Sequence, residues 1–193
     1  MRNFLGGLIG IVIGSFSLVN LAGLNSSQPS FPDPFKALGF LPNGSWVFQS
    51  TLQELFNQTL VIPILASWLI VGVVVAPFSR KGWNLLRSTI WVGVFLTIFA
   101  LMFQILENPS FWDVNLNPTR NYDLLFQFVT SIIVSLFALP SAIPITLIIE
   151  KTQQTKDPPI PDKIETKCEC GAVYKSNPLI CSECGRILKV VES

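Results

Sequence analysis

The sequence predicts an all-α membrane protein with four transmembrane helices, followed by a small β module at the C-terminus. Three observations support this prediction. Four apolar stretches are each close to or above the ~20 residues with which a helix crosses ~30 Å of hydrocarbon. Only 13% of the 193 residues are charged, about half of the ~25% typical of soluble domains. All four cysteines lie beyond the apolar part, near the C-terminus.

The four apolar stretches define a predicted transmembrane domain over residues 1–149. They cover about residues 4–24, 59–78, 88–106 and 124–149. The 15 phenylalanines and 5 tryptophans of the chain are suited to lipid-facing and interfacial positions. We therefore expect a multi-pass protein of the cell membrane whose first partner is the lipid bilayer.

The first stretch also resembles a secretory signal peptide, which would be removed and would leave three spans. It is long, however, and it contains no convincing cleavage site between small residues. Gly6, Gly10 and Gly14 recur every four residues, which lines one helix face with small residues and lets another helix approach closely. We expect residues 1–24 to be retained, with this face packed inside the bundle or between subunits.

The distribution of lysine and arginine predicts the orientation of the chain. The loop 79–87 contains three of these residues, whereas the longer loops 25–58 and 107–123 contain one each. Cytoplasmic loops carry the excess of positive charge, so the 79–87 loop is predicted to be cytoplasmic. With an even number of spans, the N- and C-termini are then both cytoplasmic.

The predicted outer loop 25–58 contains two further features. Asn25, Asn43 and Asn57 match the N-glycosylation pattern, of which Asn57 lies too close to the second span; one or two matches are expected by chance among eleven asparagines. Further along, five apolar residues share one face at helical spacing, which predicts a short helix lying at the outer interface. These residues are Trp46, Phe48, Leu52, Leu55 and Phe56.

The predicted spans carry little chemistry. None has an ionisable residue between its ends, and the chain has no histidine, so the usual general base is missing. Polar residues such as Gln104 and Gln127 are explained by hydrogen bonds between helices, worth ~0.6 kcal/mol each. Pro63, Pro140 and Pro144 are expected to kink their helices. No internal repeat of the transporter type is found. We expect no enzyme, and we identify no small-molecule substrate.

A polar linker is predicted over residues 150–167, between the last span and the first cysteine. Pro158, Pro159 and Pro161 lie close together in it. Such a segment has nothing to bury and is expected to be an extended, semi-rigid spacer.

The C-terminal stretch KCECGAVYKSNPLICSECGRIL contains the pairs Cys168-x-Cys170 and Cys181-x-x-Cys184, each followed at once by glycine. This pattern resembles the zinc-ribbon family over about residues 167–191 and nowhere else. The resemblance implies that residues 168–191 fold around one Zn²⁺ held by these four cysteines. The first pair departs from the family pattern because one residue, not two, separates its cysteines.

The resemblance also implies a secondary structure for the tail. Residues 172–175 and 179–180 would form the arms of a hairpin, with a turn at 176–178. Residues 186–191 would supply a third strand.

A metal ion is also expected on physical grounds. About 25 residues cannot bury enough apolar surface to offset chain entropy, whereas zinc bound by four thiolates supplies ~10 kcal/mol or more of folding energy. Two disulfides are the main alternative, which the reducing cytosol disfavours; iron in a rubredoxin-like site is another. Four cysteine ligands leave no open position, so the site is expected to be structural.

The charges of the tail bear on its partner. Lys167, Lys175, Arg186 and Lys189 oppose three glutamates, so the module is nearly neutral and lacks the basic surface of a nucleic-acid-binding domain. We expect a protein partner. The sequence therefore favours an accessory or scaffold subunit of a membrane complex that anchors a cytosolic zinc ribbon. The alternative is a small transporter or channel with a regulatory ribbon.

Overall fold

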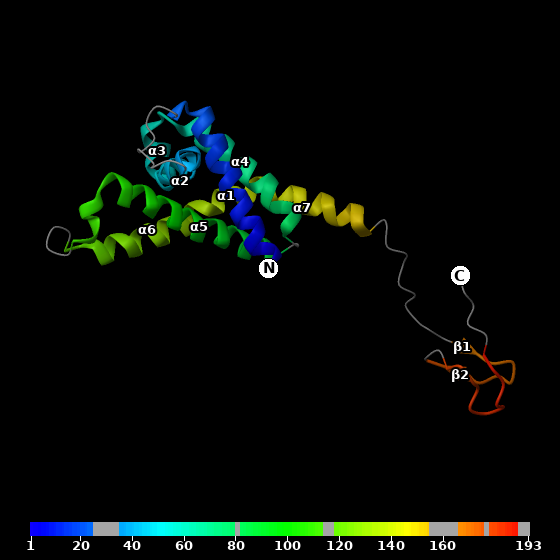
Figure 1. The fold of residues 1–193 in the computed structure, drawn as a ribbon. Helices are drawn as coiled ribbons and strands as arrows, with labels where there is room; N and C mark the ends of the chain where they lie inside the picture. The colour runs from blue at the N-terminus through cyan, green and yellow to red at the C-terminus, as the bar shows by residue number, and fades with distance from the viewer. Residues whose placement is uncertain (25–34, 80–81, 114–117, 155–165, 176–177, 189–193) are drawn as a thin grey trace. The chain divides into compact units, whose positions relative to one another are not determined.

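The computed structural model describes the chain except for residues 25–34, 80–81, 114–117, 155–165, 176–177 and 189–193. It divides into two compact units, Met1–Gln154 and Thr155–Ser193. The first unit is helical (Figure 1). Its α-helices are α1 (Arg2–Leu21), α2 (Phe40–Gln49), α3 (Thr51–Asn57), α4 (Val61–Val75), α5 (Trp83–Glu107), α6 (Arg120–Ser135) and α7 (Leu139–Gln154). Short 3-10 segments join or extend them: η2 (Phe35–Leu38), η3 (Ala76–Phe78), η4 (Pro109–Trp112) and η5 (Leu136–Ala138).

Four helical segments of the described chain are long and apolar enough to cross a membrane, which confirms the predicted number. They are Arg2–Leu21, Val61–Phe78, Trp83–Glu107 and Arg120–Thr152. Large apolar side chains on these segments lie exposed, among them Leu69, Ile98 and Phe126. Large exposed apolar areas are rare on proteins surrounded by water and are expected on helices that face lipid.

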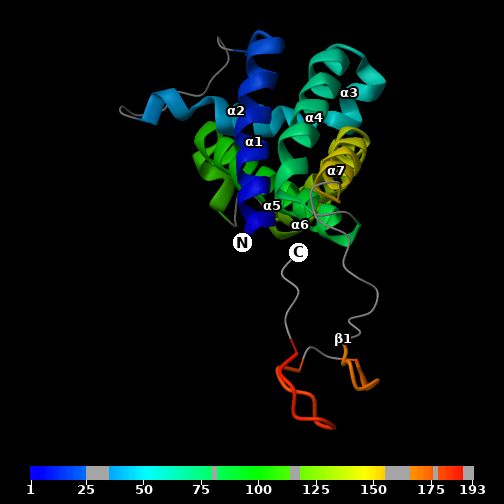
Figure 2. The ribbon, with the colours of Figure 1, turned by 90° about the vertical axis from the view of Figure 1, so that its right-hand side faces the viewer.

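Helix α1 packs against α4 and α5 (Figures 1 and 2). Its glycine face packs against α4 within the bundle, which settles the alternative left open by the sequence. A Cβ atom placed on Gly6 would lie 2.6 Å from Cβ of Phe78, and one on Gly10 would lie 2.8 Å from Cγ2 of Val75. Any larger side chain would therefore push the two helices apart.

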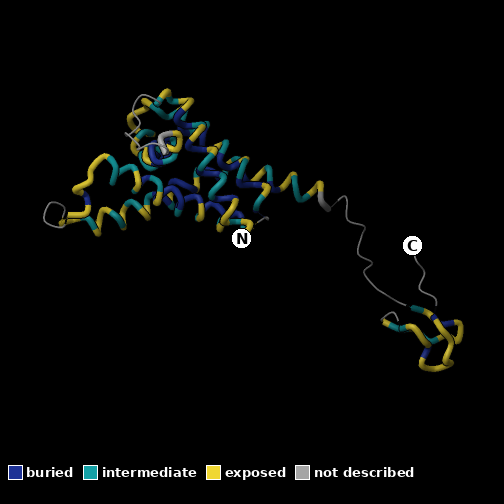
Figure 3. The backbone as a smooth tube through the Cα atoms, in the orientation of Figure 1, coloured by how far each residue is buried: buried dark blue, intermediate teal, exposed yellow. Residues whose placement is uncertain are grey.

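Buried residues collect where α1, α4 and α5 meet (Figure 3). This core consists of Ile11, Leu18, Phe48, Ile64, Trp68, Val71, Val75, Val92, Phe95, Leu96, Val134 and Ala138. Trp68, in the middle of α4, packs on Phe48 with ring centroids 4.5 Å apart. Its indole nitrogen donates a hydrogen bond to Oγ1 of Thr51 at 3.0 Å, so the one polar atom of this large buried side chain is satisfied.

The predicted interfacial helix differs from the one observed. It is broken at Ser50 into α2 and α3, and α2 packs against α1 and α5 of the bundle. This packing depends on a contact between residues distant in sequence: a Cβ atom placed on Gly44 would lie 2.7 Å from Cα of Ser15. Asn43 is only 3% exposed and donates to the Leu24 carbonyl at 3.3 Å, so it is a poor glycosylation site. Asn25 lies outside the described residues.

The three prolines differ in their effect on the helices. Pro140 has no N–H to donate to the carbonyl four residues earlier. In agreement, the 3-10 segment η5 directly before it interrupts the fourth long segment between α6 and α7. Pro144 lies inside α7. Pro63 lies in the first turn of α4, where its missing N–H costs nothing, so the predicted kink there is wrong.

The second unit contains two small hairpins. Strand β1 (Thr166–Lys167) pairs antiparallel with β2 (Val173–Tyr174), and Ile180 forms an isolated bridge with Ile187. The predicted pairing of 172–175 with 179–180 is wrong, because each cysteine pair closes a hairpin of its own. The predicted turn lies partly outside the described residues, as do Pro158, Pro159 and Pro161. The predicted linker range 150–167 includes the end of α7 at one side and β1 at the other.

The close packing of α1 on α4 leads to a first prediction. Gly14→Leu should lower the thermal midpoint of the detergent-solubilised protein by roughly 3–10 °C, since overpacking costs about 1–3 kcal/mol and a Cβ at Gly14 already overlaps Val71. Ile13→Leu, at an exposed neighbouring position, serves as the control and should leave the midpoint unchanged. Equal midpoints for the two variants would contradict the packing.

Candidate functional site

Four cysteine sulfur atoms form the clearest candidate site of the described chain. Sγ atoms of Cys168, Cys170, Cys181 and Cys184 all lie within 4.8 Å of one another. The 168–184 and 170–181 sulfur pairs are 3.5 Å apart, well beyond the ~2.05 Å of a disulfide. A tetrahedral tetrathiolate zinc site with Zn–S bonds of ~2.3 Å has edges of about 3.8 Å. The cluster therefore fits a metal ion bound by four sulfurs.

The two hairpins present their cysteines through the same hydrogen bonds. In the first, the amide of Cys168 donates to the Ala172 carbonyl, and the Gly171 amide donates back to the Cys168 carbonyl, both at 2.9 Å. In the second, the Cys181 amide donates to the Arg186 carbonyl at 2.8 Å, and the Gly185 amide donates to the Cys181 carbonyl at 2.9 Å. The first cysteine pair has one intervening residue fewer, and it forms the same two hydrogen bonds with a turn that is one residue shorter.

The backbone conformation explains why a glycine follows each cysteine pair. Gly171 has φ +94° and Gly185 has φ +70°, in the left-handed region that other residues adopt only with strain. The chain can therefore reverse directly after the second cysteine of each pair, which brings the two pairs together.

Tyr174 lies next to the cysteine cluster and contacts one of its sulfur atoms. Its hydroxyl oxygen is 3.0 Å from Sγ of Cys181 and accepts a hydrogen bond from the Ser182 amide, also at 3.0 Å. The hydrogen bond from Tyr174 lowers the pKa of Cys181 to about 6, because it stabilises the thiolate. At Cys170, the amide of Ala172 lowers the pKa, but hydrogen bonding with the Cys168 and Cys181 thiols outweighs it and leaves the pKa raised. Cys181 is thus the thiol most ready to bind a cation.

Apart from the cysteines, the described residues of the second unit form few stabilising contacts. Its buried cluster consists of Cys168, Cys181 and Leu188, with Ala172 and Tyr174 packed against it. The ion pair between Arg186 and Glu169, at 2.6 Å, is exposed on both sides, and such pairs contribute ~1 kcal/mol at most. Since the apolar core is this small, the cysteine cluster is the element on which the fold of the tail depends.

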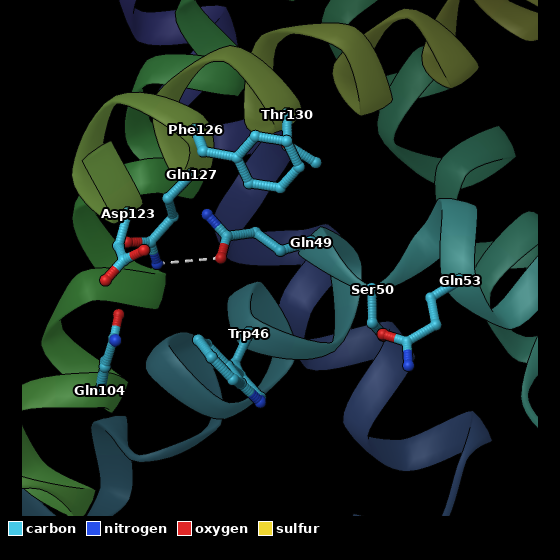
Figure 4. A pocket seen from close by; sticks show the side chains of 9 residues that line it. All are labelled: Trp46, Gln49, Ser50, Gln53, Gln104, Asp123, Phe126, Gln127 and Thr130. Carbon is cyan, nitrogen blue, oxygen red and sulfur yellow. Dashed lines mark hydrogen bonds between the residues drawn. The ribbon is translucent and has the colours of Figure 1, made fainter. Parts of the chain in front are cut away.

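A polar pocket in the first unit is a second candidate site (Figure 4). It has a volume of about 330 Å³ and lies between α2, α3, α5 and α6. Nε2 of Gln127 donates to Oε1 of Gln49 at 3.0 Å, and Nε2 of Gln49 donates to Oγ of Ser131 at 2.6 Å. The lining residues are Trp46, Gln49, Ser50, Gln53, Gln104, Asp123, Phe126, Gln127 and Thr130.

Sequence analysis does not predict this pocket. Hydrogen bonds between helices explain Gln104 and Gln127 individually, and Gln49 and Gln53 lie within the short helix predicted in the loop 25–58. Their convergence depends on the insertion of α2 between the long helices. Gln53 and Gln104 form no side-chain hydrogen bond within the described part of the chain, so their amides are available to a polar ligand. Amides both donate and accept hydrogen bonds, which suits an uncharged solute.

Comparison with known proteins finds no matching family model, curated protein or solved structure. The resemblance to zinc ribbons therefore rests on the cysteine motif and on the geometry of the cluster.

The contact between Tyr174 and Cys181 leads to a second prediction. Tyr174→Phe should weaken Zn²⁺ binding about 10- to 100-fold at pH 7, which is typical when a hydrogen-bond partner of a ligand is removed. Without the hydroxyl, the pKa of Cys181 returns toward its ordinary value, and the metal must displace one more proton at neutral pH. Competition with a chromophoric chelator, using the full-length protein in detergent, measures the affinity.

The same experiment at higher pH supplies the control. Above the ordinary thiol pKa of 9.0, Cys181 is ionised in both proteins, so the difference in affinity should shrink. A deficit of equal size at pH 7 and pH 9.5 would contradict the role assigned to Tyr174.

Proposed function

We propose that this chain is a non-enzymatic integral membrane protein that anchors a cytosolic zinc ribbon, through which it docks a protein partner as an accessory or scaffold subunit. One observation carries the proposal: the small metal-binding tail exposes apolar side chains around its cysteine cluster. Ile180 is 57% exposed and Ile187 is 77% exposed. A module of this size has no reason to leave such residues in water unless something covers them.

The apolar residues form a defined pair. Ile180 and Ile187 face each other across the antiparallel bridge, so their side chains lie on the same side of the hairpin. The buried Leu188 is the next residue along the chain, and neighbouring residues of an extended segment point to opposite sides. The isoleucine pair therefore points away from the cysteines and is available for docking. Leu179 and Val173 are also exposed.

Zinc is the metal that we propose for the cluster. Tetrahedral sites of four sulfurs are occupied by zinc or by iron, and four protein thiolates leave no position for a substrate or water. Such a site supplies folding energy and no chemistry of its own. Its role is to hold the hairpin with the isoleucine pair in shape, which agrees with a binding module more than with an enzyme.

The membrane location and orientation belong to the same proposal. Four long apolar segments and their exposed apolar surface support insertion in a bilayer. The excess of lysine and arginine between the second and third segments supports a cytoplasmic position for that loop. Both termini are then cytoplasmic, on the reducing side where thiols stay free to bind metal.

The docking surface leads to a third prediction. When the full-length protein is purified from native membranes in mild detergent, the double variant Ile180→Ser, Ile187→Ser should lose a stoichiometric partner that the unaltered protein retains. Its metal content, measured by mass spectrometry, should remain one zinc ion per chain, because the pair points away from the sulfurs.

Two further variants complete this experiment. Lys175→Ser, at an exposed polar position of the same unit, should keep the partner. Cys181→Ser combined with Cys184→Ser should lose both the metal and the partner. Retention of the partner by the isoleucine variant, or absence of zinc from the unaltered protein, would contradict the proposal.

A small transporter or channel is the second candidate function, and the polar pocket favours it. Four glutamine side chains line one pocket between helices, and two of them have no hydrogen-bond partner within the described residues. Their amides could replace the hydration of an uncharged polar solute in the pocket. Vesicles containing the purified protein should then swell faster than empty vesicles in iso-osmotic glycerol, as followed by light scattering. Gln104→Leu should slow the swelling. Equal rates for protein-containing and empty vesicles would count against transport of this kind.

A further inference from the structure

A second, larger cavity of about 990 Å³ lies where α1 and α5 begin. Arg2 on α1 and Arg87 on α5 both line it, and no acidic residue of the described chain does. Its walls are apolar and include Phe4 and Leu5 from α1 and Ile90 and Trp91 from α5. The cavity thus combines two fixed positive charges with an apolar surface.

The two helices that form this cavity are held in place by close packing. A Cβ on Gly7 would lie 2.7 Å from Cβ of Trp91, so α1 contacts the α5 backbone almost directly. The rings of Phe4 and Trp91 meet edge to face, with centroids 5.1 Å apart. The Arg2 side chain donates to the Pro77 carbonyl at 3.2 Å, which fixes its position near the end of the second long segment. The arrangement is therefore built into the fold.

Within the described residues, no carboxylate pairs with either arginine of the cavity. The ion pair between Arg186 and Glu169 lies in the other unit, and Arg2 and Arg87 are not part of it. A guanidinium presents several N–H donors in a planar fork that matches the oxygens of a phosphate group. Two guanidinium groups on one cavity therefore favour an anionic phosphate ligand.

We propose that this cavity binds the headgroup of an anionic phospholipid, with the phosphate between Arg2 and Arg87 and an acyl chain along the apolar wall. Basic pockets between helices on the cytoplasmic side of a membrane bind lipids of this class. The exposed apolar side chains of Phe4, Leu5 and Trp91 offer a surface that a free phosphate ion cannot use. This inference rests on the proposed membrane insertion and is independent of the tail and of its partner.

The test is lipid binding by the full-length, delipidated protein in mild detergent, measured by native mass spectrometry and by thermal shift. Phosphatidylglycerol should bind and raise the thermal midpoint, whereas phosphatidylcholine with the same acyl chains should not. Inorganic phosphate at the same concentration distinguishes a lipid from a free-ion site. A shift with phosphate equal to that with phosphatidylglycerol would overturn the lipid assignment.

Variants locate the site. Arg87→Gln should weaken phosphatidylglycerol binding about tenfold or more, since a hydrogen bond to a charged group is lost together with its charge. Arg87→Lys, which keeps the charge, should recover part of the affinity. Lys151→Gln removes a positive charge elsewhere in the helical unit and should bind the lipid normally. Unchanged affinity in Arg87→Gln, or an equal loss in Lys151→Gln, would overturn the proposal. Because none of these readouts involves the cysteines, a negative result would leave the docking proposal untouched.

Discussion

Close contact between helix backbones is the constraint on which the helical unit depends. In lipid no hydrophobic force drives helices together, so they associate through dispersion contacts and hydrogen bonds that small residues permit. Several of the main crossings have such a residue: Gly14 between α1 and α4, Gly7 between α1 and α5, Gly44 between α2 and α1, Gly72 between α4 and α7, and Gly93 between α5 and α6. These glycines let the backbones of neighbouring helices approach closely, so larger side chains at these positions would disturb the packing.

The tail meets the opposite constraint, because it has too little apolar surface to fold by burial. Its cluster of Cys168, Cys181 and Leu188 is far smaller than the core of an independent domain. A metal ion held by the four sulfurs, which lie within reach of one ion, would supply the missing energy and leave the outer side of the second hairpin free. With the proposed metal stabilising the fold, Ile180 and Ile187 are not needed in a core and can stay exposed.

The sequence predicted what depends on long or regular patterns. Four uninterrupted apolar runs defined the long helices, and the spacing of the cysteines with their glycines predicted the cluster that the structure brings together. It could not predict contacts set by distant residues. Asn43, Gly44 and Ser45 read as a polar loop, yet they are buried because Gly44 contacts the Ser15 backbone and Ser45 lies 3.3 Å from the Ser15 hydroxyl. The strands of the tail are two residues long, too short for any periodicity to assign their partners.

Helix α5 contributes lining residues to both cavities of the helical unit, so its length gives the approximate distance between them. Arg87 lines the basic cavity and Gln104 lines the polar pocket, and 17 residues of α-helix span about 25 Å at 1.5 Å per residue. This length is close to the ~30 Å of a hydrocarbon core. If α5 crosses the bilayer, the two cavities fall at opposite interfaces, with the arginines at one and the single acidic side chain of the pocket, Asp123, at the other. In the orientation predicted from the lysine and arginine of the loops, which already counts Arg87, the arginine cavity would lie at the cytoplasmic leaflet, where anionic lipids are enriched.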